Sequence, residues 1–214
     1  MVELLVGTAI GLIIVAAATT VVVRHARENR ALMVEARLVQ DLRTAADIVS
    51  RDLRRAGYWA ASASGVRGDD GSAVVANPYA ALTPDGAASD AVRLSFSRDA
   101  SENGLVDNNE QFGFRLRNGT IELQLGASNW QALTDPATLV VTAFNVAPHT
   151  EETSLARFCA EPCAAGSTSC PPRQQVRSFM LAIAGRSALD ANVTRSVQSG
   201  VRLRNVSVVG NCEG

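Results

Sequence analysis

A run of twenty residues without a charge, from Leu4 to Val23, constrains the chain more than any other feature. In a helix such a run covers about 30 Å, which is the thickness of the hydrocarbon core of a bilayer. Arg24 follows, and the sequence beyond it mixes polar and apolar residues. A cleavable secretory signal would need a basic segment before a short apolar core, and neither is present. The run therefore predicts one membrane-spanning helix that anchors the chain.

Glu3 stands at the entrance to this apolar run. A carboxylate is costly to bury in an apolar helix bundle unless a positive group neutralises it. One interpretation places Glu3 at the level of the lipid headgroups, where it also favours the positive end of the helix dipole. The other interpretation is that Glu3 pairs with a positive group of a neighbouring subunit in an assembly.

The helix is expected to continue far beyond the apolar run, because neither proline nor glycine occurs between Leu12 and Ala56. Apolar residues then recur at intervals of three or four, which is typical of a helix that packs on a sheet. Gly57 provides the stop. A helix of about 55 residues would be roughly 80 Å long, so its first half must contact lipid or other subunits. The residues expected to pack against the head are Leu42, Ala46, Val49, Leu53 and Ala56.

Two segments give the chain a family resemblance. The sequence VELLVG at residues 2–7, followed by the apolar run, resembles the N-terminus of type IV pilins and pseudopilins. The sequence QDLRTAADIVSRDLRRAGYWA at residues 40–60 resembles the minor pilin PilW, which is required for pilus assembly. The resemblance implies removal of a leader by a dedicated peptidase and methylation of the new N-terminus. It also implies that Glu3 compensates the N-terminal amine of a neighbouring subunit.

The charges around the apolar run conflict with this resemblance over orientation. Arg24, His25, Arg27 and Arg30 follow the run, whereas Glu3 precedes it. The positive-inside rule would place the side after the run in the cytoplasm. The resemblance and the cysteines imply the reverse, with a single pass through the inner membrane and the head in the periplasm. We adopt the second interpretation.

The chain is expected to fold as an α+β protein of the pilin type, in three parts. Residues 1–27 form the transmembrane or fibre-core half of the helix, residues 28–57 its amphipathic half, and residues 58–214 a β-rich head. Asn118-Gly119 predicts a tight hairpin turn. We expect the strands to form an antiparallel sheet on the amphipathic half of the helix. The segments with strand-like composition are 91–97, 112–117, 120–125, 139–145, 176–184 and 201–209.

The four cysteines are expected to form two disulfides, as is usual for a protein exported from the cytoplasm. Three pairings are possible, and we favour one in which Cys212 ties the C-terminus to the loop that contains the other three. A zinc site is the alternative, but no Cys-x-x-Cys motif occurs and the two histidines are not at ligand spacing. The candidates for disulfide bonds are Cys159, Cys163, Cys170 and Cys212.

The segment from Asp99 to Glu110 fits the twelve-residue pattern of a calcium-binding loop. Gly104 occupies the position of the sharp turn, and the hard oxygens that calcium requires are available around it. The flanking segments have the composition of strands and not of the helices of an EF-hand, so a polar hairpin loop is the alternative. The expected ligands are Asp99, Ser101, Asn103, the carbonyl of Leu105, Asp107 and Glu110.

No catalytic motif of the Gly-x-Ser-x-Gly, phosphate-loop or His-Glu-x-x-His type occurs, so we expect no enzymatic activity. The net charge of −1 gives no indication of nucleic-acid binding. The leading hypothesis is a minor pilin that helps to initiate the type IV pilus in a tip or priming complex. Its expected partners are other minor pilins, the major pilin, a pilus-tip adhesin and the inner membrane. A type II secretion pseudopilin and a membrane-anchored, calcium-dependent adhesion module are the alternatives.

Overall fold

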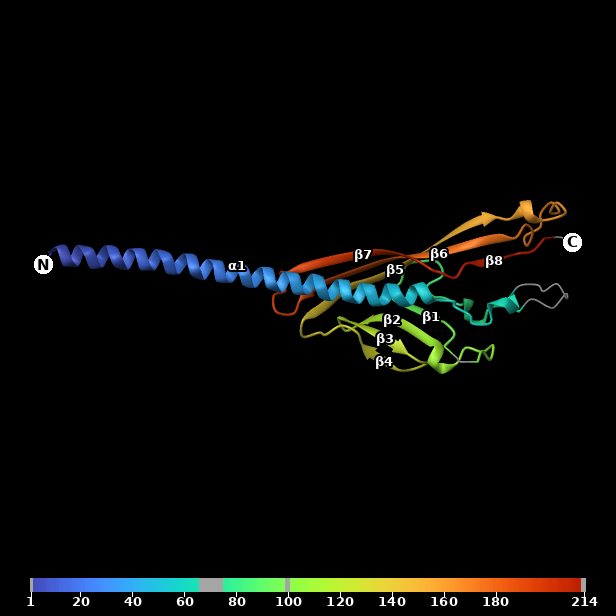
Figure 1. Cartoon of the computed structure of the whole chain (residues 1–214), viewed down its shortest axis with the longest axis horizontal. Coiled ribbons are helices and arrows are strands. Elements are labelled where there is room, and N and C mark those ends of the chain that lie inside the picture. Colours follow the sequence, from blue (N-terminus) through green and yellow to red (C-terminus); the bar gives the residue numbers. More distant parts are fainter. Residues whose placement is uncertain (1, 66–74, 99–100, 213–214) are drawn as a thin grey trace.

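The computed structural model describes residues 2–65, 75–98 and 101–212 and shows one long helix that carries a β-rich head (Figure 1). The helix, α1 (Val2–Arg55), has 54 residues, which corresponds to about 80 Å. Its first half projects away from the head, and its second half lies along the strands (Figure 1). The N-terminal end of α1 and the C-terminal end of the chain lie at opposite ends of the molecule (Figure 1).

The end of α1 is fixed by hydrogen bonds from the head. Gly57 has a φ of 73°, a conformation that glycine adopts without steric cost. Its N–H donates to the carbonyl of Ser95 over 2.9 Å, so the turn after the helix is joined to a strand. The side-chain amide of Asn205 donates to the carbonyl of Ala56 over 2.9 Å. The helix therefore stops where the head supplies partners for its last polar groups.

The first sheet contains four antiparallel strands in chain order. Asn118 and Gly119 both have positive φ between the second and third strands, as the predicted hairpin turn requires. The third strand contains Ile121, which is fully buried. The strands are β1 (Ala91–Ser95), β2 (Gln111–Arg117), β3 (Thr120–Leu125) and β4 (Trp130–Ala132).

The second sheet is built on two long strands, and its second and third strands pack on α1. The two long strands pair antiparallel along almost their whole length, with one irregularity between Val141 and Ala143. The third strand continues the sheet, and a short fourth strand pairs with the far end of the second. The strands are β5 (Leu139–Ser154), β6 (Arg173–Ser187), β7 (Thr194–Arg202) and β8 (Ser207–Val209).

A backbone bridge connects the second sheet to the segment that leads into the first sheet. Ser89 and Val146 exchange backbone hydrogen bonds of 3.1 and 2.8 Å, so β5 is held beside the segment that leads into β1. The 3-10 helices are η1 (Ser62–Gly65), η2 (Pro78–Ala80), η3 (Asn108–Glu110) and η4 (Ala156–Phe158).

One hydrophobic core unites α1 with both sheets. Each of the five helix residues predicted to face the head is at most 3% exposed. The largest core side chains come from α1 and from both sheets, so neither sheet could bury its inner face alone. The members that contribute most volume include Leu38, Leu42, Leu53, Phe96, Phe114, Ile121, Leu139, Leu181 and Ile183.

The predicted α+β pilin-like fold is confirmed, but the single antiparallel sheet that was expected is wrong, because the strands form two separate antiparallel sheets. Three further differences concern individual strands. The expected strand 201–209 is wrong as a single element, because the chain leaves the sheet after Arg202 and pairs again only at Ser207. Between these points Asn205 turns toward the end of α1 and caps it. The short strand β4 was not expected, and β5 and β6 extend well beyond their predicted ends.

Two disulfides lie at the far end of the β5–β6 ribbon. Cys159 is bonded to Cys212, and Cys163 to Cys170. The first disulfide joins the segment after β5 to the segment after β8, which brings the C-terminal segment next to the connection between β5 and β6. The second closes a short loop within that connection.

The packing of α1 predicts that Leu53→Ala destabilises the head by roughly 2–5 kcal/mol, because the buried leucine would leave a cavity. Leu53 is 0% exposed. The control is Arg51→Ala on the same helix, where the side chain is 69% exposed and a change within about 0.5 kcal/mol is expected. Thermal unfolding of the full chain in detergent, followed by the circular dichroism of the sheets, measures both. Equal stability of the two variants would contradict the packing.

The disulfides predict unequal losses when each is replaced by two serines. The sequence separations are 53 residues for Cys159–Cys212 and 7 residues for Cys163–Cys170. Closing a loop restricts the unfolded chain by an amount that grows with loop length, so removal should cost about 4 and about 2 kcal/mol respectively. Melting temperatures of the two double variants under oxidising conditions test the order. A larger loss for the Cys163–Cys170 pair would contradict it.

Candidate assembly site: the uncovered helix and the base of the head

The first half of α1 exposes a continuous apolar surface. No part of its most apolar 18-residue window is buried in the structure. By length and composition this segment can cross a membrane. Soluble monomers rarely expose an apolar surface of this extent, so the segment needs lipid or other helices around it. The most exposed of its large apolar residues include Val2, Leu4, Leu12, Ile13, Val21 and Val22.

Two threonines in the second half of the apolar run form hydrogen bonds inside the helix. The hydroxyl of Thr19 donates to the carbonyl of Ala16 over 2.9 Å, and that of Thr20 to the carbonyl of Ala17 over 2.7 Å. Such bonds to the preceding turn spare a hydroxyl the cost of lying unpaired in hydrocarbon. The segment is therefore compatible with lipid or with a dry helix bundle.

Glu3 lies in the first turn of α1 and is exposed. No salt bridge joins it to another residue in the described part of the chain. The structure thus places the predicted assembly residue on the uncovered end of the helix, where a neighbouring molecule can reach it.

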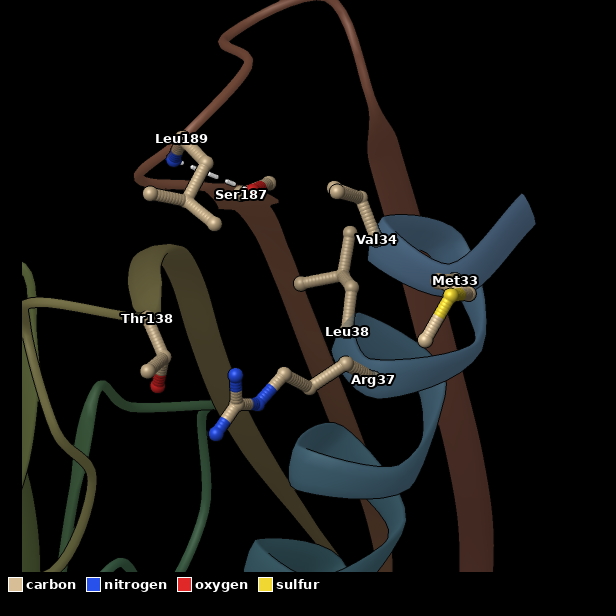
Figure 2. A pocket seen from close by; sticks show the side chains of 7 residues that line it. All are labelled: Met33, Val34, Arg37, Leu38, Thr138, Ser187 and Leu189. Carbon is tan, nitrogen blue, oxygen red and sulfur yellow. Dashed lines mark hydrogen bonds between the residues drawn. The ribbon is translucent and has the colours of Figure 1, made fainter. Parts of the chain in front are cut away.

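A pocket at the base of the head lies between α1 and the strands that begin and end there (Figure 2). Its volume is about 140 Å³. Met33 and Leu189 on its rim are 73% and 72% exposed, and Leu38 forms part of its inner wall. We call this feature the basal pocket. It is lined by Met33, Val34, Arg37, Leu38, Thr138, Ser187 and Leu189.

Polar contacts hold the walls of the basal pocket in place. Glu35 on α1 pairs with Arg195 on β7, and the hydroxyl of Thr138 donates to the carboxylate of Asp41 over 3.2 Å. On the opposite wall the buried hydroxyl of Ser187 accepts the N–H of Leu189 over 3.1 Å (Figure 2). The pocket is therefore built by fixed elements, with the apolar Met33 and Leu189 on its rim and the charged Arg37 also in its lining (Figure 2).

The predicted calcium loop is only partly assembled as the pattern requires. Asp99 lies outside the described residues, and Ser101 is exposed. Asn103 donates to a carboxylate oxygen of Asp107 over 2.8 Å and accepts the N–H of Leu105 over 2.7 Å. These loop groups bond to one another, which shapes the loop.

Glu110 is buried and accepts hydrogen bonds from backbone N–H groups. Its carboxylate is 0% exposed and accepts the N–H of Arg98 over 2.7 Å and that of Asp107 over 3.0 Å. Burial alone would raise the pKa of Glu110, but these N–H groups and the hydroxyl of Tyr79 outweigh it and lower the pKa. Within the described residues no three His, Cys, Asp or Glu side chains converge as a metal site. Calcium binding by the twelve-residue pattern stays a prediction.

Tyr79 and Glu102 are residues of this region that the sequence analysis did not single out. The Tyr79 hydroxyl lies 2.9 Å from the Glu110 carboxylate and 3.1 Å from that of Glu102. Burial, followed by these hydrogen bonds to the two carboxylates, raises the pKa of Tyr79 well above its usual value. No spacing rule connects a tyrosine in a loop with acids more than twenty residues later, so no sequence signal could have identified the contact.

The histidines and cysteines form no zinc site in the described part of the chain. His149 is exposed and lies 3.7 Å from Glu151, and His25 is exposed on α1. All four cysteines are in disulfides, so none offers a thiolate ligand.

Comparison with known families gives one match. The model of the family named prepilin peptidase-dependent protein B matches residues 31–203, which include the head-bound half of α1 and most of the head. Neither a curated protein nor a solved structure matches the chain significantly. The predicted relationship to pilins is confirmed by the family match, whereas the more specific likeness to PilW stays a prediction. The chain is a pilin-related protein and belongs to the family of prepilin peptidase-dependent protein B.

Proposed function

We propose that this protein is a minor pilin that is built into a type IV pilus and helps to initiate its assembly. The observation that carries the proposal is the division of α1, whose second half is buried in the head while its apolar first half is uncovered. The family's dependence on a prepilin peptidase, as its name states, fits a subunit that leaves the membrane for a fibre. The likeness of residues 40–60 to PilW favours a role at initiation.

The uncovered half of α1 serves two environments in turn. In the inner membrane its apolar side chains contact lipid, and in the fibre they contact the helices of neighbouring subunits. The exchange costs little hydrophobic free energy, because lipid tails and apolar side chains are about equally apolar. Since α1 contains no proline or glycine between Leu12 and Ala56, the head follows the helix as one rigid body.

The head lies in the periplasm before assembly. Two disulfides in the head favour an oxidising compartment, because cytosolic thiols are kept reduced. Arg24, Arg27 and Arg30 would favour the opposite orientation under the positive-inside rule. We give the disulfides more weight than the charges. Charges beside a single membrane span only bias its orientation, whereas the two disulfides would be reduced in the cytoplasm.

Glu3 forms an ion pair with a neighbouring subunit in the fibre. Once the helix enters a bundle, its carboxylate must be paired, because an isolated buried charge costs several kcal/mol. The positive group is the N-terminal amine of a neighbouring pilin. Pairing at one position along an otherwise uniform apolar surface also fixes the stagger between the two helices.

The basal pocket receives apolar side chains of a neighbouring subunit's α1. Ten residues separate Val23 from Met33, a rise of about 15 Å along the helix. A neighbour shifted along the fibre by about this distance brings its apolar run beside Met33 and Leu189. The neighbours are other minor pilins, the major pilin and an adhesin at the pilus tip.

A pseudopilin of a type II secretion system is the second candidate, because the same anchor and the same head-bound helix would serve it. The two candidates differ in where the protein acts and not in how it assembles. Deletion of the gene separates them, since loss of surface pili is expected for a minor pilin and loss of a secreted enzyme for a pseudopilin.

Glu3→Ala is predicted to leave the protein in the membrane but to keep it out of pili. Removing one partner of a buried pair leaves the other charge unpaired at a cost of roughly 3–5 kcal/mol, so the amount in sheared pili should fall at least about tenfold. The control is Glu28→Ala, an exposed acid beyond the apolar run. Immunoblots of membranes and sheared pili measure both pools, and normal incorporation of Glu3→Ala would refute the role of Glu3.

Leu189→Asp is predicted to block incorporation without unfolding the head, because it places a charge at the mouth of the basal pocket. Leu189 is 72% exposed, so the change in stability should stay within about 0.5 kcal/mol. Val208→Asp, at a residue that is 59% exposed on β8, is the matched control and should assemble normally. Melting temperatures and the content of sheared pili give the comparison. Equal incorporation of the two variants would exclude the basal pocket as an interface.

A further inference from the structure

A cluster of oxygen atoms lies beside η3, and the hydroxyl of Tyr79 cannot donate a hydrogen bond to all of them at once. The hydroxyl of Tyr79 is within hydrogen-bond distance of three acceptors, namely Glu102 at 3.1 Å, the Leu105 carbonyl at 3.1 Å and Glu110 at 2.9 Å. A phenol has a single proton and can donate it to one acceptor at a time. Two of the three oxygens therefore lack the Tyr79 proton at any moment.

Two further oxygens of the cluster are buried without a hydrogen-bond partner. They are Oγ of Ser97, a residue that is only 5% exposed, and Oε2 of Glu102. Ser97 lies against both Glu102 and Tyr79 without reaching full hydrogen-bond geometry with either. Buried polar atoms in native proteins almost always have partners. An unpaired hydroxyl beside an unpaired carboxylate oxygen therefore indicates that something else binds there.

The cluster also carries negative charge that the described part of the chain does not neutralise. Backbone N–H groups donate to both carboxylates, from Gly104 to Glu102 over 3.0 Å and from Arg98 and Asp107 to Glu110. No arginine or histidine forms a salt bridge with either glutamate among the described residues. Two neighbouring carboxylates of this kind attract a cation.

We propose that this cluster binds a calcium ion through Glu102, Ser97, Glu110 and the carbonyl of Leu105, with water completing the shell. All four ligands offer oxygen, and calcium accepts six to eight oxygens in irregular arrangements that magnesium does not tolerate. Nitrogen and sulfur ligands, which zinc prefers, are absent from this set. Only two of the ligands are charged, so the affinity belongs to the weak class of extracellular calcium modules, on the order of 10⁻⁴–10⁻³ M.

This ligand set differs from the twelve-residue pattern of the sequence analysis. Both sets contain Leu105 and Glu110. The pattern adds Asp99, Ser101, Asn103 and Asp107, of which Asn103 and Asp107 bond to each other. The buried cluster adds Glu102, which the pattern leaves without a role, and Ser97, which lies outside it. The two sets can therefore be distinguished by substitution.

A calcium ion in this position would join segments that are far apart in the sequence. Tyr79 comes from η2, Ser97 follows β1, and Glu110 closes η3. The N–H of Ser97 also donates to the carbonyl of Tyr58, which follows the end of α1. Binding would thus fix the loops at this side of the head relative to the helix. This inference does not depend on the proposed function in pilus assembly.

Terbium luminescence tests the site in the full chain in detergent, because Tb³⁺ occupies calcium sites and is excited through nearby tyrosine such as Tyr79. We expect one saturable signal that excess Ca²⁺ displaces. Glu102→Gln should weaken binding about tenfold or more. Removing a group that only hydrogen-bonds to a metal ligand already lowers the affinity for the metal by about this factor. Asp107→Asn and the distant, exposed Asp190→Asn should keep the wild-type affinity. Each variant's melting temperature without metal verifies that it is folded.

Ser97→Ala provides a second test, which removes a proposed ligand without changing any charge. It replaces Glu102→Gln as the test of metal binding if Glu102→Gln fails to fold. It should weaken binding while the melting temperature without metal stays near the wild-type value. The proposal is overturned if no saturable signal is found up to millimolar metal. It is equally overturned if Asp107→Asn weakens binding as much as Glu102→Gln does. If Glu102→Gln is unfolded, Asp107→Asn is compared with Ser97→Ala instead, and an equal loss of binding overturns the proposal.

Discussion

The burial of one face of α1 in the head is the interaction on which the rest of the structure depends. Leu42, Val49 and Leu53 are at most 1% exposed, and their side chains belong to the same core as the inner faces of both sheets. Neither sheet has a second layer of its own, so the helix is the element that closes the core. Because the helix continues without a break into its apolar half, any partner that binds this half also positions the head.

The burial of α1 in the head also explains why different kinds of residue are found at the two ends of the molecule. Near the N-terminus the surface is apolar and uniform, and Glu3 is its one charged side chain before Arg24. At the opposite end, loops, disulfides and a buried oxygen cluster replace regular packing. The basal pocket lies between these two ends, at the base of the head, and its rim residues Met33 and Leu189 are exposed because the head ends there. Assembly through the helix thus leaves the far end of the head free for other contacts.

The sequence predicted the elements whose signals are local. The apolar run, the three-and-four spacing of α1 and the Asn118-Gly119 turn each specify their structure within a few residues, and all three are present. The break at Leu203 was missed because it depends on Asn205 reaching the end of α1, about 150 positions earlier in the chain. The Tyr79 cluster was missed for the same reason, since tertiary contacts alone bring Tyr79 to Glu102 and Glu110. The loop pattern identified Glu110 as a calcium ligand, but it could not show that this side chain is buried and accepts the N–H groups of Arg98 and Asp107.

In the proposed assembly, one unbroken helix belongs both to the head and to a fibre. Mass spectrometry of the intact chain, recovered separately from purified pili and from the periplasmic fraction, tests this arrangement. The chain in the pili should retain the apolar run from Leu4 to Val23 together with its head. A chain found only as a soluble periplasmic monomer that has lost its first two dozen residues would contradict it.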